Sequence, residues 1–244
     1  MSAPQMLSRA GEPAIAYRFR DGQGPAVLFL PGYKSDMLGS KAVALDEWAA
    51  RTGRPLLRLD YSGCGESEGA FEDGTLARWR DEVLALVDAT EGPLLLVGSS
   101  MGGWLMLLVA LARPERVKAM VGIAAAPDFT DWGFTQEEKM TILREGRIAR
   151  PSDYGEPLVT TRAFWQSGEA ARMLQRTIPL HCPVRLLQGQ RDPDVPWATA
   201  LHLAERLGSA DVQVTLVKDG DHRLSRPQDI ALLIATVERL LEAL

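Results

Sequence analysis

The five residues from Gly98 to Gly102 read Gly-Ser-Ser-Met-Gly, which is the spacing of a nucleophile elbow. In this register Ser100 is the nucleophile, and Ser99 occupies the variable position. Glycine at both ends removes side chains that would collide where a strand turns sharply into a helix. Residues 93–98 have the apolar run of a buried strand, and residues 101–113 are apolar nearly all round, as in a buried helix. This context predicts a serine nucleophile at the end of a strand.

A serine hydroxyl needs a base to take its proton, and the sequence offers three histidines for that role. His222 is favoured, because it lies in a loop between the last predicted strand and the last predicted helix. His181 precedes a strand and His202 falls inside a predicted helix, positions typical of surface or packing histidines. We therefore expect His222 to be the base.

A carboxylate should hold that histidine in the useful tautomer, and it is expected between the serine and the histidine along the chain. Asp192 is favoured, because it follows a buried strand (184–188) and should emerge at the same sheet edge as the serine. Asp128 and Asp194 remain alternatives, since each also follows or shares a loop at a strand end. Asp221 is expected to shape the turn that carries the histidine.

Two backbone N–H groups are candidates for an oxyanion hole, which stabilises the negative charge of a tetrahedral intermediate. One belongs to Met101, directly after the nucleophile, and the other to Tyr33, in the loop that follows the apolar run Ala26–Leu30. Only the main chain of Tyr33 is needed for this role. No metal ion and no cofactor is predicted.

The glycine-rich loop after residue 60 reads YSGCGESEG, and its single Gly-x-Gly is a weak match to a phosphate-binding loop. It lacks the Lys-Ser/Thr ending of a nucleotide cradle, so Gly63 and Gly65 are interpreted as turn formers. Cys64 is expected to be a small buried thiol. With Cys182 as the second of only two cysteines, the chain has neither a disulfide framework nor a cysteine-built zinc site.

Short apolar runs alternate with longer helical patterns over most of the 244 residues, which predicts an α/β fold with a mostly parallel central sheet and helices on both faces. Residues 15–20 alternate as a half-exposed edge strand. The further expected strands are 26–30, 55–60, 93–98, 117–124, 184–188 and 212–217, and the expected helices are 40–51, 75–90, 101–113, 197–207 and 226–244.

The alternation breaks between residues 127 and 177, where polar residues mix with proline and large apolar side chains. We interpret 127–177 as a helical cap inserted in a core made of 1–126 and 178–244. Trp132, Phe134 and Trp165 are the candidates for lining an apolar substrate pocket under this cap. Equally, these aromatic side chains could simply pack the cap onto the core.

Charge and composition exclude several kinds of partner. The chain has 27 basic and 32 acidic residues, a net charge of -5, which argues against nucleic acid binding. The longest uncharged apolar stretch, the twelve residues from Met101 to Ala112, is too short to cross a bilayer. The first residues show no apolar or Arg-rich amphipathic leader pattern, so a cytoplasmic location is expected.

The order of these motifs resembles that of the α/β-hydrolase superfamily over essentially the whole chain; the carrying segments are LPGYKSD, DYSGCGES, GSSMGG, GQRDPDVP and GDH. More narrowly, longer segments are similar to a thioesterase family that acts on palmitoylated proteins and acyl glucuronides; they include LPGYKSDMLGSKA, GPLLLVGSSMGGWLML and CPVRLLQG. The resemblance implies a triad of Ser100, Asp192 and His222, with Tyr33 and Met101 at the oxyanion hole. Gln188 departs from the histidine of many relatives, and residues 127–177 contain no run that matches.

These observations predict a serine hydrolase that cleaves carboxylic esters or thioesters through an acyl-enzyme. Its substrate is expected to be a small-molecule ester or thioester, or an acylated protein. Two alternatives stay open: a carbon–carbon bond hydrolase with the same three residues, and a non-catalytic relative that only binds a ligand or partner.

Overall fold

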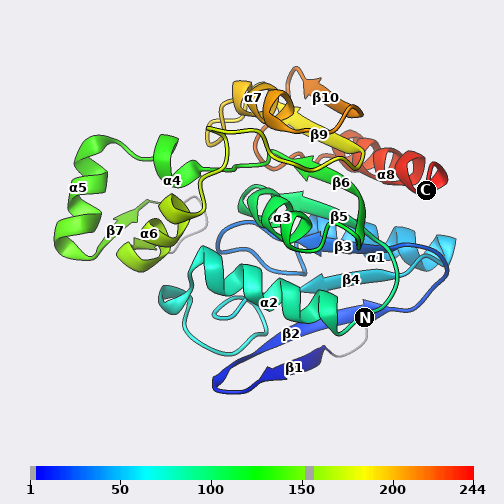
Figure 1. The fold of residues 1–244 in the computed structure, drawn as a ribbon, viewed down its shortest axis with the longest axis horizontal. Helices are drawn as coiled ribbons and strands as arrows, with labels where there is room; N and C mark the ends of the chain where they lie inside the picture. Colours follow the sequence, from blue (N-terminus) through cyan, green and yellow to red (C-terminus); the bar gives the residue numbers. More distant parts are fainter. Residues whose placement is uncertain (1–3, 152–156) are drawn as a thin grey trace.

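The structure, a computed structural model, describes residues 4–151 and 157–244. Residues 1–3 and 152–156, which belong to the predicted core and cap, lie outside the described part. A central sheet of eight strands has the order β1-β2-β4-β3-β5-β6-β9-β10 (Figure 1). Its strands are β1 (Gln5–Arg9), β2 (Glu12–Arg20), β3 (Ala26–Leu30), β4 (Leu56–Leu59), β5 (Leu94–Ser99), β6 (Val117–Ile123), β9 (Val184–Gly189) and β10 (Val212–Val217).

Strand direction brings the predicted site to one edge of this sheet. β1 pairs antiparallel with β2, and β2 pairs antiparallel with β4, whereas every pair from β4 to β10 is parallel. The carboxyl ends of β3, β5, β9 and β10 therefore meet at the same edge. The loops that follow them carry the residues predicted to act together, which is where open α/β sheets place their ligands.

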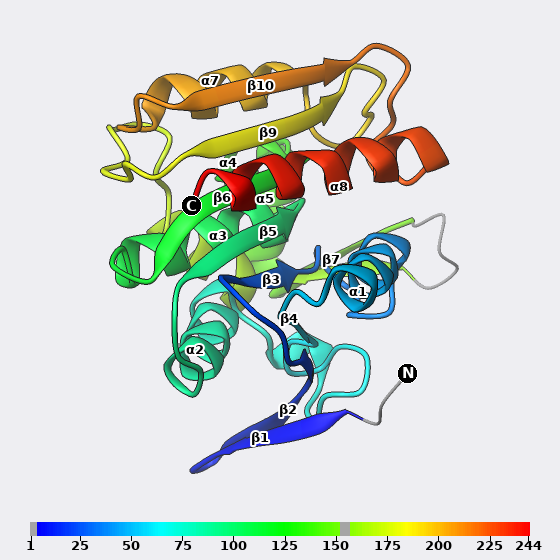
Figure 2. The same cartoon turned by 90° about the vertical axis from the view of Figure 1, so that its right-hand side faces the viewer.

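Helices cover both faces of the sheet, as Figure 2 shows. On one face, α1 (Ser40–Thr52) and α8 (Pro227–Glu242) bury an apolar cluster against the strands. On the other face lie α2 (Leu76–Asp88), α3 (Met101–Ala112) and α7 (Ala198–Arg206), over a second cluster. A short 3₁₀ helix, Phe71–Asp73, precedes α2.

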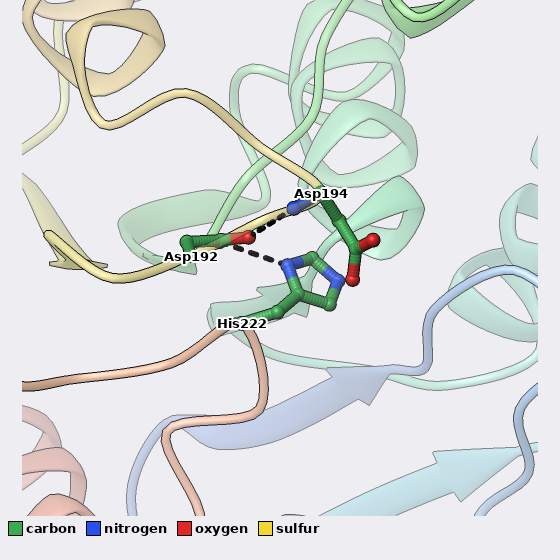
Figure 3. Close-up of side chains that lie close together, drawn as sticks. All are labelled: Asp192, Asp194 and His222. Carbon is green, nitrogen blue, oxygen red and sulfur yellow. Dashed lines mark hydrogen bonds and ion pairs between the residues drawn. The ribbon is translucent and has the colours of Figure 1, made fainter. Parts of the chain in front are cut away.

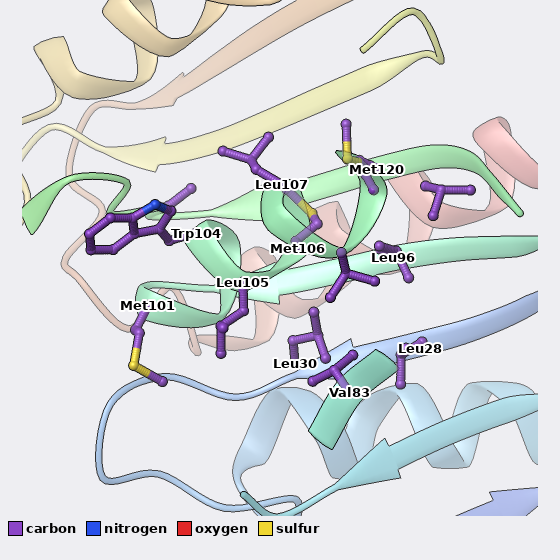
Figure 4. Packing of buried hydrophobic residues seen from close by; sticks show 14 of the residues in the cluster. Leu28, Leu30, Val83, Leu96, Met101, Trp104, Leu105, Met106, Leu107 and Met120 are labelled. Carbon is purple, nitrogen blue, oxygen red and sulfur yellow. The ribbon is translucent and has the colours of Figure 1, made fainter. Parts of the chain in front are cut away.

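The helix α3 is buried because its sequence leaves it no polar face. Side chains of α3 lie among those of the central strands, Leu28, Leu30, Leu96 and Met120 (Figure 4). Strand β5 is buried along its whole length, consistent with its unbroken apolar run. The turn that joins β5 and α3 is thus held by apolar packing on both sides. Burial of each large apolar side chain there contributes about 2 kcal/mol to stability.

The described residues of the segment 127–177 leave the sheet between β6 and β9, and their helices α4, α5 and α6 lie to one side of it in Figure 1. Their described elements are α4 (Phe129–Trp132), α5 (Gln136–Glu145), β7 (Arg147–Arg150), β8 (Leu158–Thr161) and α6 (Arg162–Ala170). Strands β7 and β8 form a separate antiparallel pair. We call this segment the cap. At its base, the buried Asp128 carboxylate accepts hydrogen bonds from the N–H groups of Met173 (2.9 Å) and Leu174 (2.9 Å), which joins the two ends of the cap.

The predicted fold class is confirmed, and most predicted elements lie within one or two residues of the observed ones. The hairpin partner β1 was missed, because the half-exposed strand pairs only at the sheet edge and lacks a buried run. No helix in the described ranges has both the length and the apolar character to cross a membrane.

Candidate active site

Ser100 lies at a strained point of the backbone between β5 and α3. Its φ of 54° and ψ of −120° are outside the regions that L-residues ordinarily occupy, and such strain persists only where the surroundings enforce it. The N–H of Ser100 donates to the Ile123 carbonyl (2.9 Å), and the Ser100 carbonyl accepts from the N–H of Gly103 (2.9 Å) and Ala126 (3.0 Å). Three main-chain hydrogen bonds therefore hold the turn.

The glycines of the elbow are required by close backbone contacts. A Cβ on Gly98 would lie 2.4 Å from the Gly102 carbonyl oxygen, and one on Gly102 would lie 2.1 Å from the Leu30 carbonyl oxygen. Any side chain at either position would push α3 away from the ends of β5 and β3. Glycine stands at both ends of the elbow because the backbone approaches too closely there for any side chain, as the sequence pattern predicted.

Three side chains from distant loops form one hydrogen-bonded row. The His222 Nε2 lies 3.2 Å from the Ser100 Oγ, and the His222 Nδ1 lies 2.9 Å from the Asp192 Oδ2. The second of these contacts is drawn in Figure 3. The Asp192 side chain is fully buried, whereas that of His222 is 22% exposed. An imidazole so placed can accept a proton from the serine and have the resulting charge stabilised by the carboxylate.

The Asp192 carboxylate is fixed by further donors. Its Oδ1 accepts from the N–H groups of Asp194 (2.8 Å) and Val195 (2.8 Å), and its Oδ2 also accepts from the Gln188 side-chain amide (3.0 Å). Burial raises the pKa of Asp192, but the hydrogen bond and charge of His222, together with the backbone donors, outweigh it, and the pKa lies below its ordinary value. The carboxylate therefore stays ionised beside the imidazole.

The loops that carry the acid and the base touch each other directly. A Cβ on Gly189 would lie 2.3 Å from the Gly220 carbonyl oxygen and 2.5 Å from that of Asp221. The Asp221 carboxylate accepts from the N–H of Leu224 (2.9 Å), so this residue shapes the turn as expected.

The two alternative acids have other positions. Asp194 is exposed, and its carboxylate lies at the side of the imidazole in Figure 3. Asp128 is used at the base of the cap; its pKa is raised by burial, despite the hydrogen bonds from Leu174 and Met173. The structure therefore brings only Asp192 into hydrogen-bond contact with His222 among these three candidates, within the described residues.

Asp192, Asp194 and His222 also have potential ligand atoms within 4.8 Å of one another. A cation there would compete for the atoms that hydrogen-bond each other in the row, so the geometry assigns this cluster no metal role. The other two histidines lie elsewhere. His181 contacts the Gly208 carbonyl, and His202, on α7, lies beside Glu205.

Tyr33 and Met101, the two residues predicted to supply oxyanion donors, directly follow Gly32 and Ser100 in the chain. A Cβ on Gly32 would lie 3.4 Å from the Ser100 Cβ and 4.0 Å from its Oγ, so the loop after β3 passes directly beside the serine. In the part of the chain that the structure describes, the N–H groups of Tyr33 and Met101 donate to no protein acceptor. The first N–H groups of a helix have no intrahelical acceptor and carry partial positive charge, which favours an anion at this point.

The three cap aromatics predicted to line a pocket make their polar and ring contacts inside the cap. Trp132 donates to the Pro127 carbonyl (2.8 Å), and Trp165 donates to the Thr130 carbonyl (3.0 Å). The Arg150 guanidinium lies 4.1 Å from the centre of the buried Phe134 ring. A hollow of about 610 Å³ between α2, α3 and α6 is lined by none of the three. These contacts join segments of the cap to one another, and the pocket-lining role of the three aromatics stays a prediction.

Sequence reasoning missed the Tyr33 side chain and Gln188. The ring of Tyr33 packs against Phe71, Trp79, Phe129 and Phe164, with ring centres 4.7 to 6.1 Å apart. Gln188 looked like a neutral departure from a histidine, yet its amide contacts the acid. The sequence signal for the Tyr33 side chain was the presence of aromatic residues near positions 71, 129 and 164. The signal for Gln188 was its place directly before the loop that carries Asp192.

Comparisons with known proteins agree with this architecture. Residues 25–144 match the model of the α/β hydrolase fold family, and residues 152–239 match a model described as TAP-like protein. The chain is 42% identical to human "Palmitoyl-protein thioesterase ABHD10, mitochondrial", over 98% of this chain and 80% of that protein.

Two solved structures are similar at comparable identity. One is the alpha/beta hydrolase domain-containing protein 10 from mouse, with a TM-score of 0.93, 41% identity and 99% of both chains covered. The other is a putative hydrolase from Agrobacterium vitis S4, with a TM-score of 0.91, 41% identity, and 98% of this chain and 97% of that one covered.

The expected cytoplasmic location is wrong on these comparisons, because the curated relatives from several mammals are named mitochondrial. That expectation depended on the composition of a few N-terminal residues, and a weak local pattern of this kind does not outweigh likeness over nearly the whole chain.

Proposed function

This chain belongs to the α/β-hydrolase family, and from that premise we propose that it is a serine thioesterase that removes long acyl chains from thioesters, including acylated proteins. The names of the relatives at about 42% identity support the thioester class. The observation that carries the serine mechanism is the row from Ser100 through His222 to Asp192, with the serine held at a φ of 54°.

In the first half of the proposed reaction, the Ser100 Oγ attacks the thioester carbonyl carbon while the His222 Nε2 takes its proton. The carbonyl oxygen becomes an oxyanion, which accepts hydrogen bonds from the N–H groups of Tyr33 and Met101. Such preorganised donors are worth about 10²–10³ in turnover for each N–H. When the tetrahedral intermediate collapses, the C–S bond breaks and His222 returns the proton to the departing sulfur.

In the second half, water attacks the acyl-serine carbonyl and gives its proton to His222. The same two N–H groups hold the second oxyanion. Its collapse releases a carboxylic acid, and the proton on His222 returns to the Ser100 oxygen. The buried Asp192 carboxylate stabilises the imidazolium in both halves, which accounts for its burial next to a base.

The test compares active-site labelling and turnover in wild type, three active-site variants and one control variant. Wild type should be labelled by a fluorophosphonate probe and should hydrolyse palmitoyl thioesters faster than the matching oxygen esters. Ser100→Ala and His222→Ala should each lose turnover on the order of 10⁶ if the residues act as a unit, and Asp192→Asn about 10⁴. Ser99→Ala is the matched control, because this adjacent serine is buried and takes no part in the row.

Labelling of both wild type and Ser100→Ala would overturn the assignment of the nucleophile, and labelling of neither would favour a non-catalytic binding protein. An acyl glucuronide and a vinylogous diketone complete the substrate panel. Preferred turnover of the diketone would establish the carbon–carbon bond hydrolase alternative and contradict the thioesterase proposal.

A further inference from the structure

The side chain of Tyr33 occupies the boundary between the core and the cap. Its ring centre lies 4.9 Å from that of Phe71 and 5.9 Å from that of Trp79, both on the core side. From the cap, Phe164 on α6 approaches to 4.7 Å and Phe129 on α4 to 6.1 Å. Edge-to-face and tilted ring contacts of this kind contribute about 0.5–1.5 kcal/mol each beyond area burial. One side chain therefore packs against both parts of the molecule.

Two hydrogen bonds attach the same loop to the cap hairpin. The Tyr33 hydroxyl donates to the Val159 carbonyl of β8 (2.7 Å), and the Lys34 ammonium donates to the Pro157 carbonyl (3.1 Å). Burial raises the pKa of Tyr33 well above its usual range, so its hydroxyl stays protonated and able to donate through neutral and alkaline pH.

The two ends of this loop are instead attached to the core. At its start, the buried Tyr61 hydroxyl donates to the Pro31 carbonyl (3.1 Å). At its end, the Met37 N–H donates to the buried Asp60 carboxylate (2.6 Å). The core thus holds residues 31 and 37 by hydrogen bonds, whereas the side-chain hydrogen bonds described for Tyr33 and Lys34 between them go to the cap.

We propose that the Tyr33 side chain is a positioning residue, through which the cap sets the place of the Tyr33 N–H beside Ser100. This inference rests on the proposed function, because the N–H matters only if an oxyanion forms there. The cap then contributes to the rate of the chemical step as well as to substrate binding. A donor displaced by a fraction of an ångström still binds substrate but stabilises the oxyanion less, since misplacement of about 1 Å can cost 10²-fold.

The experiment uses Tyr33→Phe, which keeps the ring and removes the hydrogen bond to Val159. We expect kcat for a palmitoyl thioester to fall about tenfold, with KM changed less than twofold. An acyl trifluoromethyl ketone forms a hemiketal oxyanion on Ser100, so its inhibition constant should rise in parallel with the loss in kcat/KM. Fluorophosphonate titration counts the active sites, and Tm reports on folding.

Tyr17→Phe is the matched control. The Tyr17 hydroxyl donates a hydrogen bond of the same 2.7 Å length, to Gln5, but lies in the β1–β2 hairpin away from the serine. Lys34→Met removes the second hydrogen bond to the cap, the one that the exposed Lys34 side chain donates to the Pro157 carbonyl. In the double variant Tyr33→Phe/Lys34→Met, kcat should fall further than in Tyr33→Phe. The single variant Lys34→Met keeps the inference testable if Tyr33→Phe folds poorly.

The inference is overturned if both Tyr33→Phe and Lys34→Met retain wild-type kcat and inhibitor affinity, or if activity falls only in proportion to the count of active sites. Failure of the proposed function gives a different result, because Ser100→Ala would then keep its turnover. If Tyr33→Phe has wild-type kinetics while Ser100→Ala is inactive, the positioning role is contradicted and the proposed function is not.

Discussion

The side-chain amide of Gln188 donates its hydrogen bond to the Asp192 Oδ2, which is also the oxygen that faces the imidazole of His222. Gln188 is fully buried at the end of β9, and it also lies within hydrogen-bond distance of the Gly189 and Val195 carbonyls. Besides His222, Gln188 is therefore one of three residues that donate hydrogen bonds to this carboxylate, with Asp194 and Val195.

Replacing this amide should slow the reaction without abolishing it. We expect Gln188→Met to lower kcat about 3- to 10-fold, because one hydrogen bond has a net value of roughly 0.5–1.5 kcal/mol. KM for a palmitoyl thioester should change less than twofold. Steady-state kinetics measure both parameters. The control variant is Gln213→Met, which replaces an exposed glutamine on β10. Unchanged kcat would mean that the N–H groups of Asp194 and Val195 suffice to hold the acid.

The close contact between Gly102 and the end of β3 predicts a steric effect on both folding and turnover. A methyl group at this position meets the carbonyl oxygens of Leu30 at 2.1 Å and Pro31 at 2.5 Å. Gly102→Ala should lower the free energy of unfolding by about 1–3 kcal/mol, as overpacking does, and should displace the loop after β3 that carries Tyr33. Thermal unfolding and kcat measure the two effects. Gly39→Ala is the control, since its added methyl group meets nothing closer than 3.6 Å; equal behaviour of the two variants would refute the steric explanation.

Cys64 should be inert in the native protein. Burial raises the pKa of its thiol to about 12, and the charges of Asp60 and Glu82 add to the effect. Because the thiolate is the reactive form, iodoacetamide at pH 8 should leave Cys64 unmodified until the chain is unfolded in guanidinium. Peptide mass mapping before and after unfolding shows this directly. Cys64→Ala should keep kcat within twofold, and a large loss would reopen a nucleophilic role for the thiol.

Lys41 gives a prediction for the alkaline range of stability. Burial lowers the pKa of Lys41 to about 8, helped by the charge of Arg223 and opposed by Asp221 and Asp229. Below pH 8 the lysine is protonated in both states, so the cost of its burial is fully present. Between pH 8 and its ordinary value of 10.5, the unfolded chain binds more protons than the folded one, and stability rises with pH.

Urea unfolding from pH 7 to 10.5 tests this sign. The difference in unfolding free energy between wild type and Lys41→Met should grow in favour of wild type as the pH rises. Lys118→Met, at an exposed position on β6, corrects for the loss of a lysine in general. A difference that is flat or falls with pH would contradict the lowered pKa.

The parts of the fold that were predictable are those with a strong one-dimensional signal. The strand β5 is a continuous apolar run, α3 is apolar on all sides, and the elbow between them needs glycine at fixed places. The boundaries of α3 and β10 could be placed closely for the same reason. Chain order and strand ends also sufficed to select Asp192 from several aspartates for the position beside His222.

Features that depend on tertiary contacts could not be predicted. In α5 only Ile142 is buried, so the helix lacks the apolar stripe that reveals a helix in a sequence. Asp128 and Asp192 both follow strands of the same sheet, and only folding shows that one closes the cap while the other faces a histidine. The cap aromatics were singled out by size, whereas the rings that contact Tyr33 come from four separate helical elements.

The direct contact between Gly189 and Gly220 has a consequence for redesign of this enzyme. Since no side chain separates the two loops there, their spacing is fixed by the thickness of the polypeptide itself. Libraries that randomise both loops should keep glycine at position 189, because any larger residue would separate the proton acceptor from its counter-ion. Gly220, Gln188 and Asp221 should be kept as well, because an added Cβ at 220 would meet Leu224 at 2.7 Å and the other two residues hold the acid and the histidine turn.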